Sequence, residues 1–532
     1  MKFYKLLAVF LTLSHITLHL PYRQVLSFLL YFIIRIVDFK QNMGFKGSFN
    51  RNYLRMKTAF SFHYAILAGL VCITFPACQN KGGVFKAKEK FPNILLIVSD
   101  DQGYNDLGIC GREDIKTPNL DQLARDGARF TNFYVTCSGC TPSRGSLLTG
   151  RYPQRNGTYE LFRNNRIEDG HVYTPYEYST SPERILGMDT REVLLPELLK
   201  KAGYYNGIFG KWDLGQLKRF LPLQRGFDEY YGFSNTGIDY YTHERYFVPS
   251  MFRNNEPTIE DKGTYSTSLF EREALRFITE NRDHPFLLYL PFNAPHGSSS
   301  LDPEIRGTIQ APPEYLALYP EGTTVQEKRR RGYMAAVTCM DNAIGNVLRL
   351  IDDYGLTDNT IVIFFSDNGG GMGSDNSPLS GGKGNMREGG LRVPCIVKWP
   401  GKVEKGRVIE NFISSMEIFP TILDVTEIEK PDSLIIDGFS ILPLLTGEKD
   451  MAREEMYWEF REEYAAKVGN LKWIKSDRRI QHNGFFDLSR DVAEQNDMSE
   501  QNPFEYQMVQ EKFHDWQREM AEAEPRGPFK NF

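Results

Sequence analysis

Residues 94–101 read Ile-Leu-Leu-Ile-Val-Ser-Asp-Asp, and residues 361–368 read Ile-Val-Ile-Phe-Phe-Ser-Asp-Asn. Each stretch is an apolar run of strand length, followed by a serine and two further polar residues. A continuous apolar run is typical of a strand that is buried on both faces, as in a parallel sheet. Phe286 to Leu290 is a third run of this kind. These runs predict the central strands of a parallel sheet.

Helical patterns lie between the predicted strands. One begins at Thr117-Pro118, which suits an N-cap followed by proline at the first helical position. Two others cover 191–202 and 328–354, and a glycine that suits a helix end follows each. Strands that alternate with helices predict an α/β fold with a large, mostly parallel sheet sandwiched by helices. We assign this domain to residues 92–425.

The pattern changes after this domain. Short apolar runs at 457–460, 471–474 and 485–488 are separated by turn residues, as in an antiparallel meander. A helical pattern follows near 504–521. We therefore expect a smaller C-terminal antiparallel-sheet subdomain, residues 426–532, with a closing helix.

The composition restricts the class of protein. Apolar residues make up 41% of the 532 residues and charged residues 25%, which is ordinary for a globular chain with a sizeable core. The net charge of −5 argues against a general nucleic-acid binder, whose surface is usually basic. Seven cysteines in so long a chain exclude a small fold held together by disulfides.

The N-terminal region resembles a targeting segment. After Met56, Lys57 supplies a positive charge, a mostly apolar stretch follows from Phe60 to Phe75, and Cys78 comes shortly after. A basic head, an apolar stretch and small residues before the cut are typical of a secretory signal. We assign residues 56–77 to a lipoprotein signal peptide, because the cysteine resembles a bacterial lipobox. The alternative is an ordinary signal peptide with an incidental thiol.

This assignment implies an exported protein that is lipid-anchored at Cys78, in the periplasm or on the cell surface. The polar, Lys-rich residues 78–91 suit a tether. Residues 1–55 would be an over-extended N-terminus, with the true start at Met56 or Met43. The alternative is a membrane-associated leader, although charges interrupt its apolar runs.

Polar side chains follow two of the predicted strands. Asp100 and Asp101 follow the first strand, and Asp367 and Asn368 follow the last. In open α/β sheets, ligands bind at the carboxyl ends of the strands. If the two strands are neighbours, three carboxylates converge and repel one another, which a divalent cation relieves. Oxygen ligands favour Ca²⁺, and less strongly Mg²⁺. The alternative is two unrelated Asp-rich turns.

A cysteine precedes another helical pattern. The sequence Cys140-Thr-Pro-Ser-Arg144 is followed by Leu148-Thr-Gly-Arg151. Pro142 suits the first turn of a helix and Gly150 its end, so Cys140 is expected at the helix N-terminus. Unpaired N–H groups there favour an anion, so a plain thiol would be a nucleophile with a lowered pKa. The alternative is a buried structural cysteine.

The sequence 140–151 resembles the signature of the type I, formylglycine-dependent sulfatases, which include arylsulfatases and glycan sulfatases. The similarity continues through Gly203-Tyr204, 210–212, 286–296, 366–370 and 382–394, and it covers roughly residues 91–500. The resemblance implies the alkaline-phosphatase-like fold. It also implies that a formylglycine-generating or sulfatase-maturating enzyme oxidises Cys140 to formylglycine (3-oxoalanine), whose hydrated aldehyde attacks the sulfur of a sulfate ester.

The resemblance also assigns roles to single residues. Ca²⁺ would be bound by the side chains that match the family's metal ligands, Asp100, Asp101, Asp367 and Asn368, together with the oxygen of the residue formed from Cys140. Arg144 and Lys211 would hold the hydrated aldehyde. His296 and Lys383 would contact the sulfate and assist departure of the alcohol. A histidine with an ordinary pKa near 6.5 can protonate a leaving oxygen near neutral pH.

One position departs from the family pattern. The family usually has Gly-Lys-Trp-His-Leu-Gly, whereas this chain has Asp213 in place of the histidine. That histidine normally serves as a base. Asp213 could accept the same proton, as a weaker base unless its pKa is raised. Alternatively, Asp213 only orients Lys211 and another base acts.

The segment 236–245 combines aromatic and hydrogen-bonding side chains. We predict that Asp239, His243 and Arg245 bind substrate, because a sugar offers both hydroxyls and an apolar ring face. Arg245 could pair with a second sulfate or a carboxylate. The alternative is an ordinary polar surface loop.

The residues and the resemblance together predict a calcium-dependent sulfatase acting on a sulfated carbohydrate, with no nucleic-acid partner and with membrane contact only through its anchor. One alternative is a phosphonate monoester or phosphodiester hydrolase with the same nucleophile. Another is a non-catalytic sulfoglycan-binding protein, which Asp213 alone supports.

Overall fold

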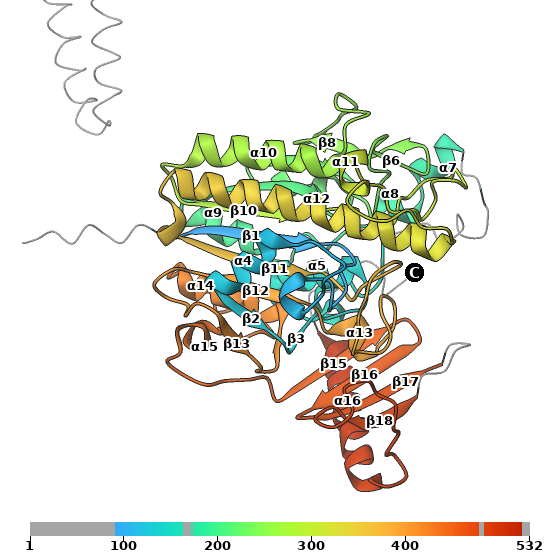
Figure 1. Ribbon diagram of the computed structural model, residues 1–532. Coiled ribbons are helices and arrows are strands. Elements are labelled where there is room, and N and C mark those ends of the chain that lie inside the picture. Colours follow the sequence, from blue (N-terminus) through green and yellow to red (C-terminus); the bar gives the residue numbers. More distant parts are fainter. Residues whose placement is uncertain (1–90, 163–170, 172–173, 478–482, 524–532) are drawn as a thin grey trace, which may run out of the picture. The chain divides into compact units, whose positions relative to one another are not determined.

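The computed structural model describes residues 91–162, 171, 174–477 and 483–523 (Figure 1). The predicted over-extended N-terminus, the signal peptide, Cys78 and all of the tether except its last residue lie outside the described residues. Within the described ranges, no helix has the length and apolar character needed to cross a membrane.

A single large sheet forms the centre of the first domain. In the described chain it has ten strands in the order β13-β2-β12-β11-β1-β10-β4-β5-β8-β9. The strands are β1 (Asn93–Ser99), β2 (Ala128–Phe130), β4 (Tyr205–Lys211), β5 (Glu229–Phe233), β8 (Met251–Arg253), β9 (Glu256–Pro257), β10 (Phe286–Pro291), β11 (Thr360–Ser366), β12 (Cys395–Lys398) and β13 (Arg407–Ile409). The five strands from β11 to β5 are parallel, and β12, β8 and β9 run antiparallel to their inner neighbours. The predicted mostly parallel sheet is confirmed.

Helices cover both faces of this sheet (Figure 1). The longer helices are α4 (Pro118–Asp126), α5 (Cys140–Thr149), α9 (Leu195–Lys201), α10 (Ser266–Asn281), α12 (Val325–Asp353) and α14 (Ile418–Val425). Residues of α4, α10 and α12 share one apolar core with the sheet, and residues of α5, α9 and α14 share another. Strand β1 separates the two cores, because Leu95 and Ile97 point into the first and Leu96 and Val98 into the second.

Short elements connect these layers. The short helices are α6 (Pro153–Asn156), α7 (Pro175–Ser179), α8 (Pro182–Ile185), α11 (Pro313–Leu316), α13 (Glu388–Leu391) and α15 (Leu442–Thr446). Two small strand pairs, β3 (Phe133–Tyr134) with β14 (Ile413–Ser414) and β6 (Glu244–Arg245) with β7 (Val248–Pro249), lie outside the main sheet.

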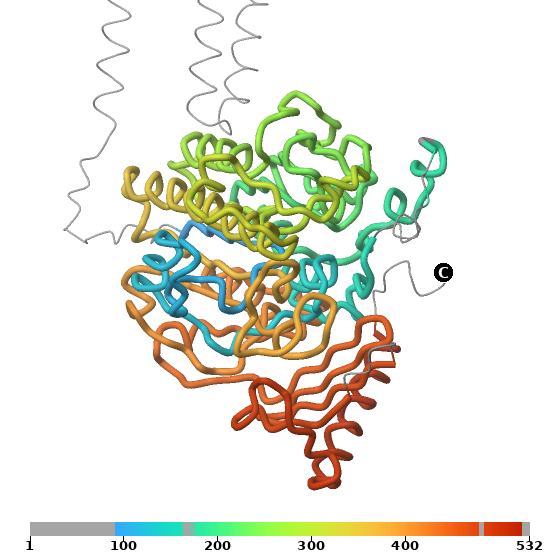
Figure 2. The backbone as a smooth tube through the Cα atoms, turned by 45° about the vertical axis from the view of Figure 1, so that its right-hand side comes forward, coloured from blue at the N-terminus to red at the C-terminus, as the bar shows by residue number. Residues whose placement is uncertain are grey.

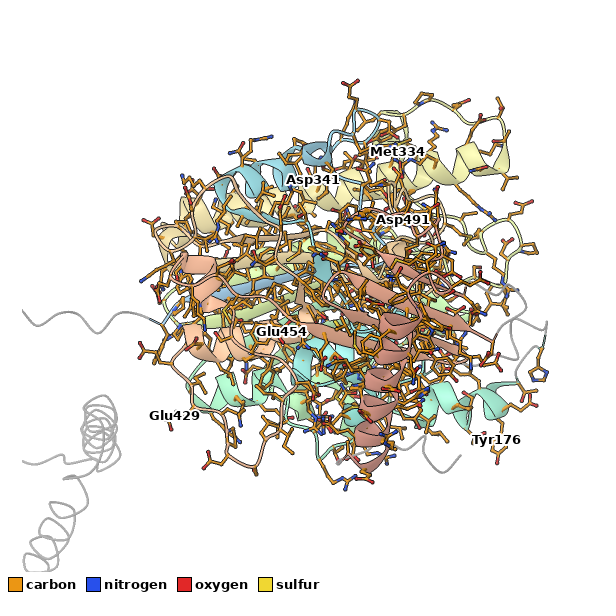
Figure 3. All side chains as sticks on the ribbon, turned by 90° about the horizontal axis from the view of Figure 1, so that it is seen from below. Tyr176, Met334, Asp341, Glu429, Glu454 and Asp491 are labelled. Carbon is orange, nitrogen blue, oxygen red and sulfur yellow. The ribbon has the colours of Figure 1, made fainter. Side chains whose placement is uncertain are left out.

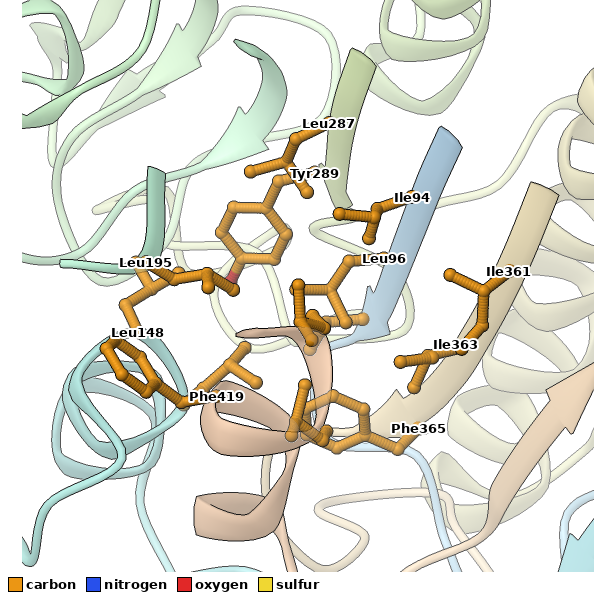
Figure 4. Packing of buried hydrophobic residues seen from close by; sticks show 14 of the residues in the cluster. Ile94, Leu96, Leu148, Leu195, Leu287, Tyr289, Ile361, Ile363, Phe365 and Phe419 are labelled. Carbon is orange, nitrogen blue, oxygen red and sulfur yellow. The ribbon is translucent and has the colours of Figure 1, made fainter. Parts of the chain in front are cut away.

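The second core shows how the fold is stabilised (Figure 4). Ile94, Leu96, Ile363 and Phe419 all belong to this core, and the first two have no exposed surface. Full burial of one such side chain contributes roughly 1.5–3 kcal/mol. The apolar runs that predict strands therefore also supply the energy that holds the sheet between its helices.

Two predicted helices differ in their bounds. Helix α9 begins at Leu195 and not at 191, because Pro196 lacks an N–H donor and is tolerated only in the first turn. Helix α12 begins at Val325, where Thr324 and Glu327 form a capping box. Farther along α12, buried Asp341 (labelled in Figure 3) accepts a hydrogen bond of 2.7 Å from the N–H of Leu120 and so joins α12 to the start of α4.

The C-terminal subdomain is a four-stranded antiparallel sheet covered by one helix (Figure 2). Its elements are β15 (Glu455–Phe460), β16 (Glu463–Val468), β17 (Leu471–Ser476), β18 (Gly484–Asp487) and α16 (Pro503–Glu522). The predicted runs are β15, β17 and β18, and β16 was missed. Residues before Glu455, such as Leu434 and Leu444, pack in the core of the first domain. The antiparallel sheet therefore starts later than the predicted boundary after residue 425.

Candidate active site

The carboxyl ends of β1 and β11 bring the predicted strand-end side chains together. The two strands pair in register with Ser99 opposite Ser366, so the residues that follow leave the sheet at the same edge. The Asn368 amide donates a hydrogen bond of 2.8 Å to Asp101, and the Asp101 N–H donates one of 3.3 Å to Asp367. The predicted convergence of three carboxylates and one amide is present in the structure.

Helix α5 presents Cys140 to this edge. Gly139 is the N-cap and Cys140 the first helical residue, as predicted. The Cys140 Sγ lies 3.4 Å from an Asp100 carboxylate oxygen. The helix is tightly held, because a Cβ added at Gly145 would lie 2.2 Å from the hydroxyl oxygen of Thr158. The cysteine is therefore fixed against the strand-end carboxylates.

Three cationic side chains pair with the three carboxylates. Arg144 donates to Asp367 through two nitrogens, at 2.7 and 2.9 Å. The Lys211 Nζ lies 2.8 Å from Asp100. The Lys383 Nζ lies 2.8 Å from Asp101. Arg144 and Lys211 are fully buried behind Cys140, whereas Lys383 faces a cavity.

The buried charges shift the acidities of the acidic groups. Burial, together with the charge of Asp100, raises the pKa of Asp367. Burial alone would raise the pKa of Asp101, but Lys383 and His296 outweigh it and the pKa is lowered. Burial and the Asp100 carboxylate raise the pKa of the Cys140 thiol well above its usual value. The expectation of a thiol with a lowered pKa is therefore wrong, because burial outweighs the helix terminus and the nearby lysines.

The donor set suits a hard divalent cation. Ligand atoms of Asp100, Asp101, Cys140 and His296 all lie within 4.8 Å of one another. The amide oxygen of Asn368 is buried and accepts no hydrogen bond from the described residues. Carboxylate and amide oxygens are the ligands that Ca²⁺ prefers, and a cation would occupy the free lone pairs of such an oxygen.

His296 differs from the sequence expectation. Its Nδ1 lies 2.7 Å from the carbonyl oxygen of Gly297, which can only accept, so Nδ1 carries the proton. Its Nε2 lies 3.8 Å from Asp101. Burial, together with the charges of Lys383 and Lys211, lowers the pKa of His296 to about 3. The expectation that His296 keeps an ordinary pKa is therefore wrong, and the ring is neutral at pH 7.

Asp213 lies next to Lys211 in a strained backbone conformation. Its φ is 59°, in the left-handed region that non-glycine residues rarely adopt. Its carboxylate lies 3.6 Å from the Lys211 Nζ. Burial raises the pKa of Asp213, although Lys211 and Arg144 oppose the shift. The raised pKa is the condition under which Asp213 becomes a better base.

A cavity of about 770 Å³ opens above Cys140. Asp101, His296 and Lys383 line its inner part together with the cysteine. Arg245 also lines it, but its guanidinium pairs at 2.7 Å with the buried carboxylate of Glu183. Glu183 and Arg306, another residue of the cavity wall, belong to no sequence motif. The sequence analysis therefore did not predict either residue.

The other two residues of the predicted substrate loop do not line the cavity. Asp239 is buried and accepts hydrogen bonds from the N–H groups of Tyr241 and Thr242, at 2.9 and 2.7 Å. The Nε2 of His243 lies 2.8 Å from the Thr264 carbonyl oxygen. Their polar atoms hold the loop in shape. We therefore correct the assignment of Asp239 and His243 and no longer place them at the substrate.

Comparisons with known proteins agree with this geometry. A family model described as "Sulfatase" matches residues 92–428, and one described as "N-sulphoglucosamine sulphohydrolase, C-terminal" matches 382–523. Human N-acetylgalactosamine-6-sulfatase is 36% identical over 405 residues, which is 72% of this chain and 71% of the relative.

Solved structures show the same fold. The crystal structure of Ps i-CgsB in complex with k-i-k-neocarrahexaose matches with a TM-score of 0.68 and 29% identity, over 80% of this chain and 93% of that one. The PsFucS1 sulfatase from Pseudoalteromonas sp. matches with a TM-score of 0.64 and 25% identity, over 82% and 92%. This chain belongs to the sulfatase family of the alkaline-phosphatase-like fold and is a sulfuric ester hydrolase.

Proposed function

We propose that this protein is a calcium-dependent sulfatase that hydrolyses a sulfate ester on a sulfated carbohydrate, using a formylglycine made from Cys140, and that it releases inorganic sulfate and an alcohol. The observation that carries the proposal is the position of Cys140, at the N-terminus of α5 and 3.4 Å from the Asp100 carboxylate, on the floor of the cavity. A maturation enzyme that oxidises Cys140 is the implied partner. The export of the protein and its lipid anchor at Cys78 are part of the proposal.

The site suits both the Ca²⁺ ion and the formylglycine that the proposal requires. Asp100, Asp101, Asp367 and Asn368 would hold Ca²⁺. When present, the ion would withdraw charge from the ester oxygens, and the hydrated aldehyde at position 140 would supply the attacking oxygen. The raised pKa of the Cys140 thiol supports modification, because an unmodified thiol is a poor nucleophile there.

The chain's own cations prepare the site for negative charge. Arg144 and Lys211 are fully buried behind residue 140, where their charges stabilise an anionic oxygen without reorganisation. Lys383 faces the cavity, where it can contact the sulfate and the leaving oxygen. His296 lies beside it. An anionic sulfate near this ring would raise its pKa and so favour proton donation from Nε2.

Asp213 is the residue we assign as base in place of the family's histidine. Its raised pKa supports proton acceptance, and Lys211 at 3.6 Å would stabilise the carboxylate. A positioned general base contributes about a hundredfold to ten-thousandfold. We expect Asp213→Asn to lower kcat by about a hundredfold and to remove the acidic limb of the pH profile. If kcat and the profile stay unchanged, Asp213 only orients Lys211.

The substrate class rests on the cavity and on the relatives. A volume of about 770 Å³ exceeds the needs of one sulfate and is in the range of pockets that hold drug-sized ligands. One relative is named for a sulfated amino sugar, and one solved structure contains a neocarrahexaose. These names support a sulfated saccharide as the substrate of this chain.

The decisive experiment uses matured, purified protein and a panel of defined sulfated saccharides. Released sulfate is measured, with Cys140→Ala as the matched inactive control, and mass spectrometry of the peptide containing residue 140 reports its oxidation. We expect sulfate release only from protein with formylglycine at 140. Faster turnover of phosphonate monoesters or phosphodiesters than of every sulfate ester would favour the hydrolase alternative. Full activity with an unmodified thiol would refute the proposed nucleophile.

A further inference from the structure

The cavity wall contains one arginine, Arg306, that pairs with no side chain of the described residues. Three cationic side chains line the cavity among the described residues: Arg245, Arg306 and Lys383. Arg245 pairs with Glu183, and Lys383 pairs with Asp101. The guanidinium of Arg306 has no hydrogen bond or ion pair with any residue in the described ranges, although the side chain is exposed. Among the described residues, none compensates the charge of this cation.

The backbone holds Arg306 close to the catalytic segment. Its own N–H donates to the carbonyl oxygen of Asp302 at 2.7 Å. The next residue, Gly307, donates to the Ser298 carbonyl at 2.9 Å, and Ser298 donates to Thr308 at 2.8 Å. These bonds close the loop 298–308 two residues after His296. The backbone of Arg306 is thus held near the base of this closed loop.

A strained aromatic turn lines the same cavity. Tyr246 and Phe247 join β6 to β7 with φ values of 50° and 68°. Two left-handed residues in a two-residue hairpin turn usually require asparagine or glycine, so bulky aromatic residues are strained there. The Tyr246 N–H donates at 2.9 Å to the carbonyl of Ser299, and the Arg245 guanidinium lies 4.6 Å from the Tyr246 ring.

The strained turn of Tyr246 and Phe247 lies beside the cavity, where an aromatic side chain can contact a ligand. Tyr246 lines the cavity, and the neighbouring Phe247 is 61% exposed. A folded protein ordinarily buries so large an apolar ring, and a rigid aromatic face suits the apolar face of a sugar ring. Tyr246 and Arg306 both line this cavity and offer it an aromatic ring and a cation that no described residue pairs with.

We propose that Tyr246 and Arg306 form a subsite for the sugar next to the one that loses its sulfate, and that Arg306 binds an anionic substituent of that second sugar, a sulfate ester or a carboxylate. This inference rests on the proposed function and specifies its substrate: an acidic glycan of at least two sugars with two negative charges. Tyr246 packs against the ring of the second sugar, and the guanidinium donates paired hydrogen bonds to two oxygens of its anion.

The test compares four substrates that share the same cleaved sulfate ester: a sulfated monosaccharide, a disaccharide with a neutral second sugar, and two disaccharides whose second sugar carries a sulfate or a carboxylate. We expect Arg306→Ala to lower kcat/KM on the dianionic disaccharides by about tenfold to a hundredfold, mostly through KM, which corresponds to a hydrogen bond to a charged group. The other two substrates should change less than twofold. The preferred anion identifies the substituent.

Two further variants make the result specific. Tyr246→Ala should weaken both kinds of disaccharide and spare the monosaccharide, because it removes packing and not charge. Arg490→Ala, an exposed arginine of the C-terminal subdomain outside the cavity, should change none of them.

The outcomes separate this inference from the proposed function. No sulfate release from any substrate by the matured wild type refutes the proposed function. Sulfate release with equal effects of Arg306→Ala on all substrates refutes the subsite alone, because Arg306 would then act on the cleaved sulfate or on the fold. The same holds if Arg306→Ala has no effect on any substrate.

Discussion

Lys472 joins the C-terminal sheet to the catalytic domain through a buried charge cluster. Its Nζ lies 2.8 Å from Glu388 and 2.9 Å from Glu494, and none of the three side chains has more than 1% exposed surface. Glu494 also accepts hydrogen bonds of 2.8 Å from the Glu388 N–H and 2.9 Å from Ser380. Ser380 and Glu388 flank the segment that carries Lys383. We therefore expect Lys472→Met to destabilise both the fold and this segment.

The size of the effect follows from the two contacts. At an effective dielectric constant of about 20, one unit-charge pair at 2.8 Å gains about 6 kcal/mol. The cost of burying each ion, several kcal/mol, cancels much of this gain. Removal of one partner leaves the other charges buried without compensation and typically costs about 3–5 kcal/mol. We expect the free energy of unfolding of Lys472→Met to fall by this amount at pH 8.

The loss of stability in Lys472→Met should depend on pH. Glu388 has a lowered pKa in the wild type: burial opposes this, but Lys472 and Arg392 outweigh it. Without Lys472, burial and mutual repulsion raise the folded-state pKa of Glu388 above the unfolded value, and they raise further the pKa of Glu494, which burial already raises in the wild type. Between the unfolded and the folded pKa of each group, the folded variant binds more protons than the unfolded chain, so its stability falls there as pH rises, by about 1.4 kcal/mol per pH unit for each group. The variant should lie closer to the wild type at pH 5 than at pH 8.

Equilibrium urea unfolding at both pH values measures these differences. The matched control is the triple variant Glu388→Gln, Lys472→Met and Glu494→Gln, which removes all three charges and should recover much of the loss. A change below about 1 kcal/mol at pH 8, or an equal loss at both pH values, would show that the cluster does not hold the subdomain as we argue.

Three other predictions concern packing and the metal site. Gly145→Ala should destabilise the protein by about 1–3 kcal/mol, seen as a lower Tm, because the new Cβ would lie 2.2 Å from the Thr158 hydroxyl oxygen; an unchanged Tm would mean that α5 shifts freely. Phe513→Ala should cost about 3–5 kcal/mol in urea unfolding, since Phe513 packs against Trp473 and Trp516 with ring centroids 5.2 and 5.6 Å away; a loss near zero would contradict this packing. Ca²⁺ added to chelator-treated protein should raise Tm, by the equivalent of about 2.7 kcal/mol at a hundred times Kd, and no rise would argue against a cation between Asp100 and its neighbours.

Much of the fold could be predicted because it depends on local sequence. The apolar runs at 94–98 and 361–365 can be satisfied only by strands buried on both faces, and residues directly after such strands must share the edge at which a ligand binds. The start of α5 at Cys140 and its end at Gly150 likewise follow from residues within the helix itself. Strand β16 escaped prediction because its Glu463 and Lys467 read as exposed positions, and burial of Lys467 beside the Phe412 ring is a tertiary contact.

By itself, the sequence determined the strand runs, the helix that presents Cys140 and the identity of the groups at the sheet edge, because each follows from residues that are close in the chain. Only the tertiary structure decided the charge state of Cys140 and His296, the pairing of Arg245 with Glu183 and the inward position of Asp239 and His243. Burial and the distance to charges from remote segments set these properties. Neither quantity is encoded in the residues that flank each group.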